Sequence, residues 1–294
     1  MQVAIDELEA IGLGQALLRH CPGLGSFRLY DAKEAGRVEA DVVIVKWPDY
    51  PAIHGRFRHK ICWLKNPGWA AQVPRLQQEF DVVFSASRTL CDQRPELIYL
   101  PVACPDPAIF RPHPPNRRLR SEVCFVGNYA RTGRPTAHVE QYLVPAAQFH
   151  FALWGLGWEA VEAPALQRLS RGRLRPERVP AVYASSQIVL INHGISHHQE
   201  NMIATRVFEA MACEAFVISD YLPALEPLRP HLVFTTGGNH LEEQIRYFLS
   251  HPQERAAKVA GARARVLQHH TMAQRSRIIA DRLQLEWVNG SPGS

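Results

Sequence analysis

Residues 201–220 read NMIATRVFEAMACEAFVISD, in which a helix-like first half runs into a strand-like second half. A helix over 201–213 would gather its larger apolar side chains on one face, which would pack on a sheet: Ala204, Val207, Phe208 and Met211. Arg206 and Glu209 lie three positions apart on another side of this helix, with small residues beside them. From the spacing alone, the two charges form either a solvated ion pair worth about 0.2–0.5 kcal/mol or part of a binding site.

Short apolar runs alternate with helical patterns on both sides of this stretch, which is typical of parallel sheets covered by helices. In the first half, strands are expected at 1–6, 26–31, 41–47, 60–65, 81–87 and 97–103, and helices at 13–21 and around 73–80. In the second half, strands are expected at 122–128, 149–155, 187–194, 215–220 and 232–238. Helices are expected there at 136–147, 179–186, 201–213, 240–250, 253–270 and 272–287.

A segment rich in proline and arginine, residues 105–120, interrupts this alternation. Its sequence PDPAIFRPHPPNRRLR holds five prolines and four arginines and continues neither a helix nor a strand. The sequence therefore predicts a domain over 1–104, a linker over 105–120, a second domain over 121–270 and a C-terminal helix and tail over 271–294. Two doubly wound domains are expected to bind a ligand outside the carboxyl ends of their strands, in the cleft between them.

The overall composition is ordinary for a globular protein. The 294 residues carry a net charge of +5, and 46% are hydrophobic and 21% charged. The six cysteines include no CxxC pair, and several lie in apolar runs, as buried reduced thiols do. Neither a signal peptide nor an apolar stretch of about 18 residues is found. These features predict a cytoplasmic protein, and the mild positive charge suits an anionic ligand.

Several stretches together carry a resemblance to a known family. They are CFVGN (124–128), LWGLGW (153–158), PVACPDPAIFRP (101–112) and ENMIATRVFEAMACEAFVISD (200–220). They resemble glycosyltransferases of the GT-B fold, and most closely the spore-maturation-type glycosyltransferase-like family, which is related to family 4 glycosyltransferases. The resemblance implies two facing Rossmann-like α/β domains with parallel sheets, followed by C-terminal helices.

The resemblance also gives Arg206 and Glu209 a role. It implies that Glu209 accepts hydrogen bonds from the ribose hydroxyls of a nucleotide-sugar, since a carboxylate suits a vicinal diol. The helix start offers free N–H groups to a diphosphate, and Arg206 adds a positive charge that can bind phosphate oxygens.

The turn GNYARTGR (127–134) is a second candidate for the diphosphate. Gly127 and Asn128 end a predicted strand, and a glycine turn lets a diphosphate approach the backbone closely. Related enzymes carry an arginine and a lysine here. This chain has no lysine there, so Arg131 or Arg134 is expected to contact the leaving diphosphate. The alternative is that the turn is simply a solvated loop.

The signature departs from the family at two positions. Family 4 enzymes place a first glutamate eight positions before the second, where this chain has Asn201, with Glu200 next to it. Either residue is a candidate for contacting the sugar, and retention or inversion stays open. The family's glycine after Ala-Cys is Glu214 here. If this helix end requires a positive φ, a non-glycine residue costs about 1 kcal/mol.

Further loops also contain candidate ligand-binding residues. The loop INHGISHHQEN (191–201) is expected to face the cleft, with His193 or Glu200 contacting the sugar, and it lacks the HExxH spacing of a metal site. The segment RLSRGRLRPER (168–178) carries five arginines without interleaved aromatics, so a solvated loop is favoured over nucleic-acid binding. The loops at 46–60 and 65–69 are expected to line the acceptor side, with these candidates: Asp49, His54 and Asn66.

The sequence thus predicts a metal-independent glycosyltransferase that moves a sugar from a nucleotide-diphospho-sugar to an acceptor hydroxyl. Arg206, Arg131 and His54 are the catalytic candidates, and the donor is a co-substrate, with no other cofactor expected. The acceptor would be a glycan, a lipid-linked intermediate or a protein, with room for peripheral membrane contact and no nucleic-acid partner. The alternative is a non-catalytic protein that binds a nucleotide or nucleotide-sugar in a degenerate GT-B site.

Overall fold

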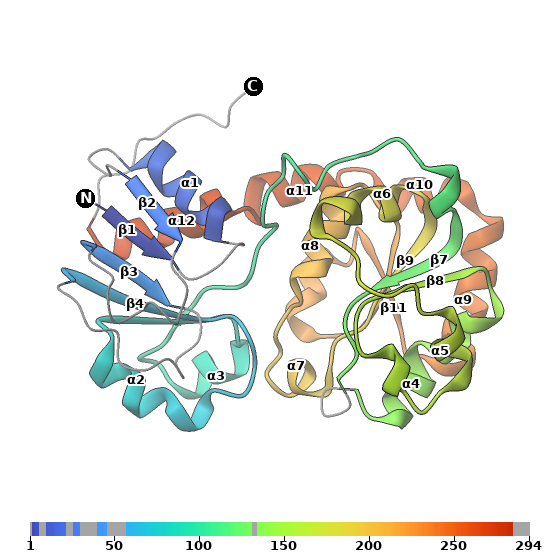
Figure 1. Cartoon of the computed structure of the whole chain (residues 1–294), viewed down its shortest axis with the longest axis horizontal. Helices are drawn as coiled ribbons and strands as arrows, with labels where there is room; N and C mark the ends of the chain where they lie inside the picture. The colour runs from blue at the N-terminus through green and yellow to red at the C-terminus, as the bar shows by residue number, and fades with distance from the viewer. Residues whose placement is uncertain are drawn as a thin grey trace. The chain divides into compact units, whose positions relative to one another are not determined.

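The chain divides into two compact units. The computed structural model describes residues 2–5, 10–21, 26–29, 40–45, 57–130 and 134–284. The first unit comprises Met1–Asp106 and His269–Ser294, and the second comprises Pro107–Gln268 (Figure 1). The chain therefore crosses from one unit to the other twice, and the C-terminal residues return to the unit in which the chain begins.

The first unit is built on a six-stranded parallel sheet. Its strand order is β2-β1-β3-β4-β5-β6, and all five neighbouring pairs are parallel. The strands are β1 (Gln2–Ile5), β2 (Ser26–Leu29), β3 (Val42–Val45), β4 (His59–Leu64), β5 (Val82–Ser85) and β6 (Ile98–Tyr99). All six lie where the apolar runs predict them.

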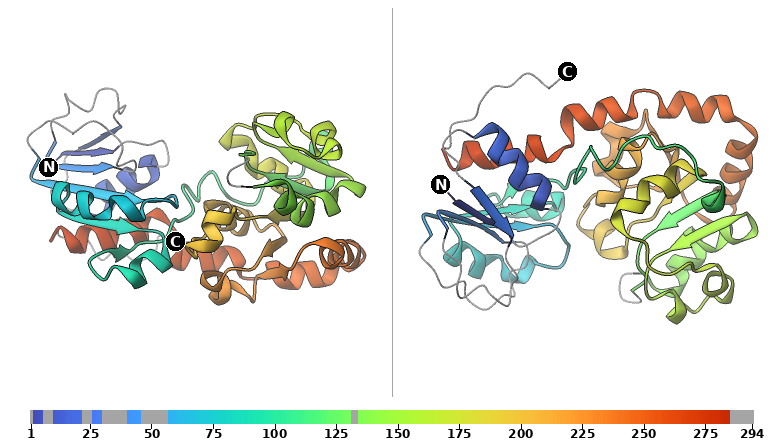
Figure 2. Two further views of the ribbon diagram at one scale, coloured as in Figure 1. Left: turned by 90° about the horizontal axis from the view of Figure 1, so that it is seen from below. Right: turned by 45° about the horizontal axis from the view of Figure 1, so that its top comes forward.

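Helices cover both faces of this sheet (Figures 1 and 2). On one face, α1 (Ala10–His20) packs with α12 (Met272–Arg282), and on the other lie η2 (Ala70–Gln72), α2 (Val73–Glu79) and α3 (Arg88–Gln93). Strand side chains alternate between the two layers: Ile61 and Trp63 join the core of α1 and α12, whereas Cys62 and Leu64 join that of α2. This alternation is the period of two that a strand imposes.

A buried arginine holds the returning C-terminal segment in the first unit. Arg275 is 4% exposed and donates to the carbonyl oxygens of Pro101 (2.6 Å), Val102 (3.0 Å) and His269 (3.2 Å). Next to it, the backbone N–H of Cys104 donates to the carbonyl of His270 at 2.8 Å. The C-terminal helix is therefore part of the first unit's core.

The second unit is built on a five-stranded parallel sheet of order β11-β10-β9-β7-β8. Its strands are β7 (Ser121–Val126), β8 (Phe151–Trp154), β9 (Ser186–Ile191), β10 (Val217–Asp220) and β11 (Leu232–Thr235). One face packs against α4 (Thr136–Tyr142), α5 (Pro164–Leu169) and α9 (Gly238–Ser250), and the other against α6 (Val179–Ala184) and α8 (Thr205–Ala212). The remaining elements are η3 (Arg117–Leu119), η4 (Val144–Gln148), η5 (Trp158–Ala160), η6 (Pro176–Arg178), α7 (Ile195–Gln199), η7 (Pro223–Leu228), α10 (Pro252–Val259) and α11 (Ala262–His269).

The predicted helix over 201–213 is wrong at its start. Asn201 has φ 47° and Ala204 is extended, so α8 begins only at Thr205. The prediction of one helix over 253–270 is also wrong, because Gly261 with φ 78° separates α10 from α11. Within the described ranges, every helix is too short or too polar to cross a lipid bilayer.

Candidate functional site

The order in which the chain adds strands to the second sheet reverses between β7 and β9. One arginine, Arg134, contacts the residues that follow these two strands. β7 and β8 run to one side of this point and β9, β10 and β11 to the other, so it is where doubly wound sheets bind ligands. Arg134 donates to the carbonyls of Asn128 (3.1 Å) and Asn192 (2.9 Å) and to Oδ1 of Asn192 (3.3 Å). All three of its guanidinium nitrogens thus contact protein acceptors.

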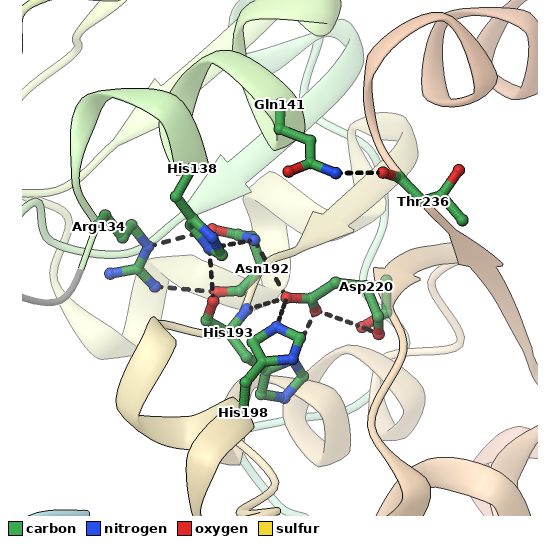
Figure 3. A network of polar contacts seen from close by, with 9 residues as sticks. Arg134, His138, Gln141, Asn192, His193, His198, Asp220 and Thr236 are labelled. Carbon is green, nitrogen blue, oxygen red and sulfur yellow. Dashed lines mark hydrogen bonds and ion pairs between the residues drawn. The ribbon is translucent and has the colours of Figure 1, made fainter.

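At the end of β10, the buried carboxylate of Asp220 accepts several hydrogen bonds (Figure 3). Oδ1 lies 2.6 Å from Nδ1 of His193, and Oδ2 lies 2.8 Å from the backbone N of His193 and 2.8 Å from Nε2 of His198. Nδ2 of Asn192 donates to Oδ2 at 3.1 Å, and the hydroxyl of Ser219 to Oδ1 at 3.3 Å. Asp220 therefore connects β10 to the end of β9 and to α7.

A histidine of α4 completes this network. Nε2 of His138 lies 2.8 Å from the carbonyl of His193 and 3.0 Å from Nδ2 of Asn192. Gln141, one turn further along α4, donates to the carbonyl of Thr236 at 2.7 Å (Figure 3). The carboxyl ends of β9, β10 and β11 are thus held by polar side chains from α4 and from the strand ends themselves.

The surroundings lower the pKa of Asp220 and the pKa values of two histidines in this buried site, His138 and His197. Burial alone would raise the pKa of Asp220, but the charge and hydrogen bonds of His193 and His198 hold it well below its usual range. Burial and, to a smaller extent, the charge of His193 lower the pKa of His197 to about 4. Burial also lowers the pKa of His138.

The charged pair of the signature helix is partly buried rather than solvated. Glu209 is 5% exposed, and its Oε2 lies 2.5 Å from Nη1 of Arg206, whose side chain is 37% exposed. The carboxylate therefore lies inside the unit, on the second turn of α8, while the arginine reaches toward solvent. A buried carboxylate with a half-exposed cation is able to bind polar groups of a ligand that displaces water.

Other predicted site residues support the turns around this edge. Oδ1 of Asn201 accepts from the backbone N of Ala224 at 2.8 Å, and Oδ1 of Asn128 accepts from that of Leu156 at 2.9 Å. The carbonyl of Gly127 accepts from Nε1 of Trp158 at 2.9 Å. Glu200 is half-buried and caps the C-terminal end of α7.

Several candidates are not placed at this edge. Arg131, Asp49 and His54 lie outside the described residues, and Asn66 is half-buried in the turn after β4 of the first unit. The arginines of 168–178 are all exposed: Arg168, Arg171, Arg173, Arg175 and Arg178. Among the residues with described positions, no three or more His, Cys, Asp or Glu side chains are grouped so as to hold a metal ion.

The structure adds three residues that the sequence analysis did not single out: His138, Asn192 and Asp220. Asp220 ends one predicted strand and Asn192 lies near the end of another, so their place at the ligand-binding edge could have been inferred from the strand pattern alone. His138 lies within a predicted helix, where nothing in the sequence marks it.

Comparison with known proteins identifies the family. The profile of a family described as "Glycosyl transferase-like" matches residues 134–281, which is half of the chain. The chain belongs to the Glycosyl transferase-like family. The match covers the whole polar network, from Arg134 to Asp220, together with the signature helix.

One curated protein and two solved structures resemble this member of the Glycosyl transferase-like family. Spore protein CgeB of Bacillus subtilis (strain 168) is 26% identical over 170 residues, which are 51% of this chain and 53% of that protein. The chain thus matches about half the length of that relative. HepE from Anabaena, solved with UDP-glucose, has a TM-score of 0.67 at 13% identity over 97% of this chain and 99% of that one. AviGT4, a glycosyltransferase involved in avilamycin A biosynthesis, has a TM-score of 0.61 at 14% identity over 97% of both chains. These structures confirm the predicted GT-B fold, with two parallel-sheet α/β units.

Proposed function

We propose that this protein is a glycosyltransferase that moves a sugar from a nucleotide-diphospho-sugar to a hydroxyl of an acceptor. The observation that carries the proposal is the burial of Glu209 beside Arg206 on the signature helix, in a unit that belongs to a glycosyltransferase-like family. HepE, which shares the fold, was solved with UDP and with UDP-glucose. A donor of this class accounts for both the buried carboxylate and the adjacent cation.

In this proposal, the two charges of α8 serve different parts of the donor. The carboxylate of Glu209 receives the ribose hydroxyls, and Arg206 with the N–H groups at the start of α8 holds the diphosphate. As the bond between the sugar and the diphosphate breaks, negative charge grows on the leaving group, and these donors stabilise it without a metal ion. The guanidinium of Arg134 already contacts Asn128 and Asn192. In this proposal Arg131 therefore supplies the additional positive charge next to the diphosphate.

The acceptor would bind to the first unit, with His54 as the candidate that contacts its hydroxyl. A glycan, a lipid-linked intermediate and a protein all offer such a hydroxyl, and the basic net charge of +5 favours an anionic acceptor.

A nucleotide panel tests the donor site. Thermal shifts would be recorded with UDP, GDP, dTDP, ADP and CMP and with their common sugar conjugates, without added metal, on wild type and on Glu209→Ala. Glu226→Ala is the matched control, since Glu226 forms an exposed pair with Arg229 at the same i,i+3 spacing in the same unit. The proposal is supported if one nucleotide raises the melting temperature of wild type and Glu226→Ala but not that of Glu209→Ala.

Turnover separates an enzyme from a binding protein. Mass spectrometry would follow consumption of the preferred nucleotide-sugar in the presence of glycan, lipid-linked and protein acceptors. Binding without turnover favours the non-catalytic alternative, and the absence of any shift with well-folded protein removes the proposal.

A further inference from the structure

The segment between β9 and α8, residues 192–204, is attached to β10 and the turn after it by a small set of side chains. Asp220 holds its first residues through Asn192 and His193 and its middle through His198. Asn201 holds its later part by accepting from the N–H of Ala224. Since α8 begins directly after this segment, these contacts determine where the first turn of α8 lies.

Most of these contacts depend on the single carboxylate of Asp220. In the part of the chain that the structure describes, every group within hydrogen-bond distance of it is a donor: two imidazoles, an amide, a hydroxyl and a backbone N–H. An ionised carboxylate is an acceptor only, so it satisfies them all. It also selects the tautomers, because a proton must sit on Nδ1 of His193 and on Nε2 of His198. Nε2 of His193 is then buried without a hydrogen-bond partner among the described residues, as is Nδ1 of His197.

We propose that Asp220 is a positioning residue for the donor site: its carboxylate holds residues 192–204, and with them the start of α8, in the conformation that binds the diphosphate. This inference rests on the proposed function for the ligand, and on the hydrogen bonds of Asp220 for the positioning. Asp220 contacts neither the donor nor the acceptor in this scheme.

The proposal predicts that an amide at position 220 cannot replace the carboxylate. In the wild type, His193 and His198 donate to Asp220 whether they are neutral or charged. In Asp220→Asn, the amide oxygen accepts but the amide nitrogen is a donor facing other donors. A neutral imidazole can turn or change tautomer to accept from it, whereas a charged one cannot. The variant should therefore bind more weakly whenever one of these imidazoles is charged. The other titratable or charged groups around Asp220 are Arg134, His138, Tyr142 and His197.

The experiment compares wild type, Asp220→Asn and Asp92→Asn by hydrogen exchange and by binding of UDP-glucose. Asp92 is an exposed residue of the first unit, with a side chain 63% exposed, so its variant controls for the chemical change. We expect amides of residues 193–207 to exchange at least about tenfold faster in Asp220→Asn only. We also expect its Kd for UDP-glucose to rise about tenfold relative to wild type.

A second pair of variants keeps the test decisive if Asp220→Asn does not fold. His198 is 32% exposed, so it can be replaced more safely. His198→Phe removes its hydrogen bond to Asp220, whereas His198→Gln keeps an N–H donor. Faster exchange and weaker binding in His198→Phe, with recovery in His198→Gln, support the proposal.

The two proposals fail in distinguishable ways. Unchanged exchange and unchanged binding in Asp220→Asn and His198→Phe would overturn the positioning role while leaving the proposed function intact. If wild type binds no nucleotide of the panel, the donor role of the segment is overturned together with the proposed function, even where exchange responds to Asp220.

Discussion

Nη1 of Arg206 lies 2.5 Å from Oε2 of Glu209, and the carboxylate is buried while the guanidinium reaches toward solvent. Arg206→Met would remove the guanidinium that pairs with this buried carboxylate. We expect the free energy of unfolding to fall by about 1–3 kcal/mol, and by less in Arg206→Lys, which keeps the charge. Urea denaturation measures both, with Arg229→Met, from an exposed i,i+3 pair, as the control. Equal losses in Arg206→Met and Arg229→Met would contradict a buried role.

Glu214 has φ 55° directly after α8, and it is exposed. The positive φ expected where the family has a glycine is therefore confirmed at Glu214. Glu214→Gly should raise the free energy of unfolding by about 1 kcal/mol, because glycine adopts a positive φ without steric cost. Glu214→Ala removes the carboxylate but keeps Cβ, so it should gain nothing. A gain of the same size in Glu214→Ala would mean that charge, not backbone strain, is responsible.

Gly155 and Gly172 form a matched pair of glycines with positive φ, at 141° and 72°. A Cβ on Gly155 would lie 2.0 Å from the carbonyl oxygen of Gly127, whereas one on Gly172 would meet nothing within 4 Å. Gly155→Ala should therefore cost about 3 kcal/mol and displace the turn at Gly127, and Gly172→Ala only about 1 kcal/mol. Chemical denaturation of the two variants measures the difference, and similar costs would show that the two strands separate easily.

Mild acid should destabilise the second unit through His197. Its pKa is about 4 in the folded protein against an ordinary 6.5, so the unfolded chain binds the proton first as the pH falls. The free energy of unfolding should therefore decrease from about pH 6.5 to about pH 4, by up to about 3 kcal/mol. His138, whose pKa is also lowered, contributes in the same direction.

Asp220 acts in a different pH range. Its pKa lies below the ordinary 3.8, so its contribution to stability is complete above that value and is lost only at lower pH. Urea denaturation from about pH 7.5 to about pH 4, on wild type and His197→Gln, separates the two. The variant should show a flatter profile, and an unchanged profile would exclude His197 as the cause.

Arg275 should matter more for the first unit than its place near the C-terminus suggests. Burial lowers its pKa to about 10, yet it remains charged and binds three carbonyls of the crossing segments. Arg275→Leu leaves these carbonyls without their donor and should cost about 3 kcal/mol. Arg282→Met, an exposed position on the same helix, is the control. Denaturation of the first unit, followed by hydrogen exchange of the β4 amides, should show a loss only in the former.

The strand positions and the parallel α/β class could be predicted from the amino-acid pattern alone. Short buried strands need apolar side chains on both faces. The runs KICWLK and DVVFSAS can therefore be recognised as strands without any tertiary information. The signature around Arg206 and Glu209 likewise pointed to the correct family, because its residue types and spacing are visible in one contiguous stretch.

The burial and the hydrogen-bond partners of the polar residues could be found in the three-dimensional structure but not in the sequence. Spacing could not distinguish a solvated Arg206–Glu209 pair from a buried one, because burial depends on which elements pack around the helix. It also could not show that Asp220 receives His193 and His198, or that Arg275 binds carbonyls 173 and 174 residues away. Hydrogen bonds between distant segments follow from sheet order and helix packing, and a linear pattern of apolar and polar residues does not specify these partners.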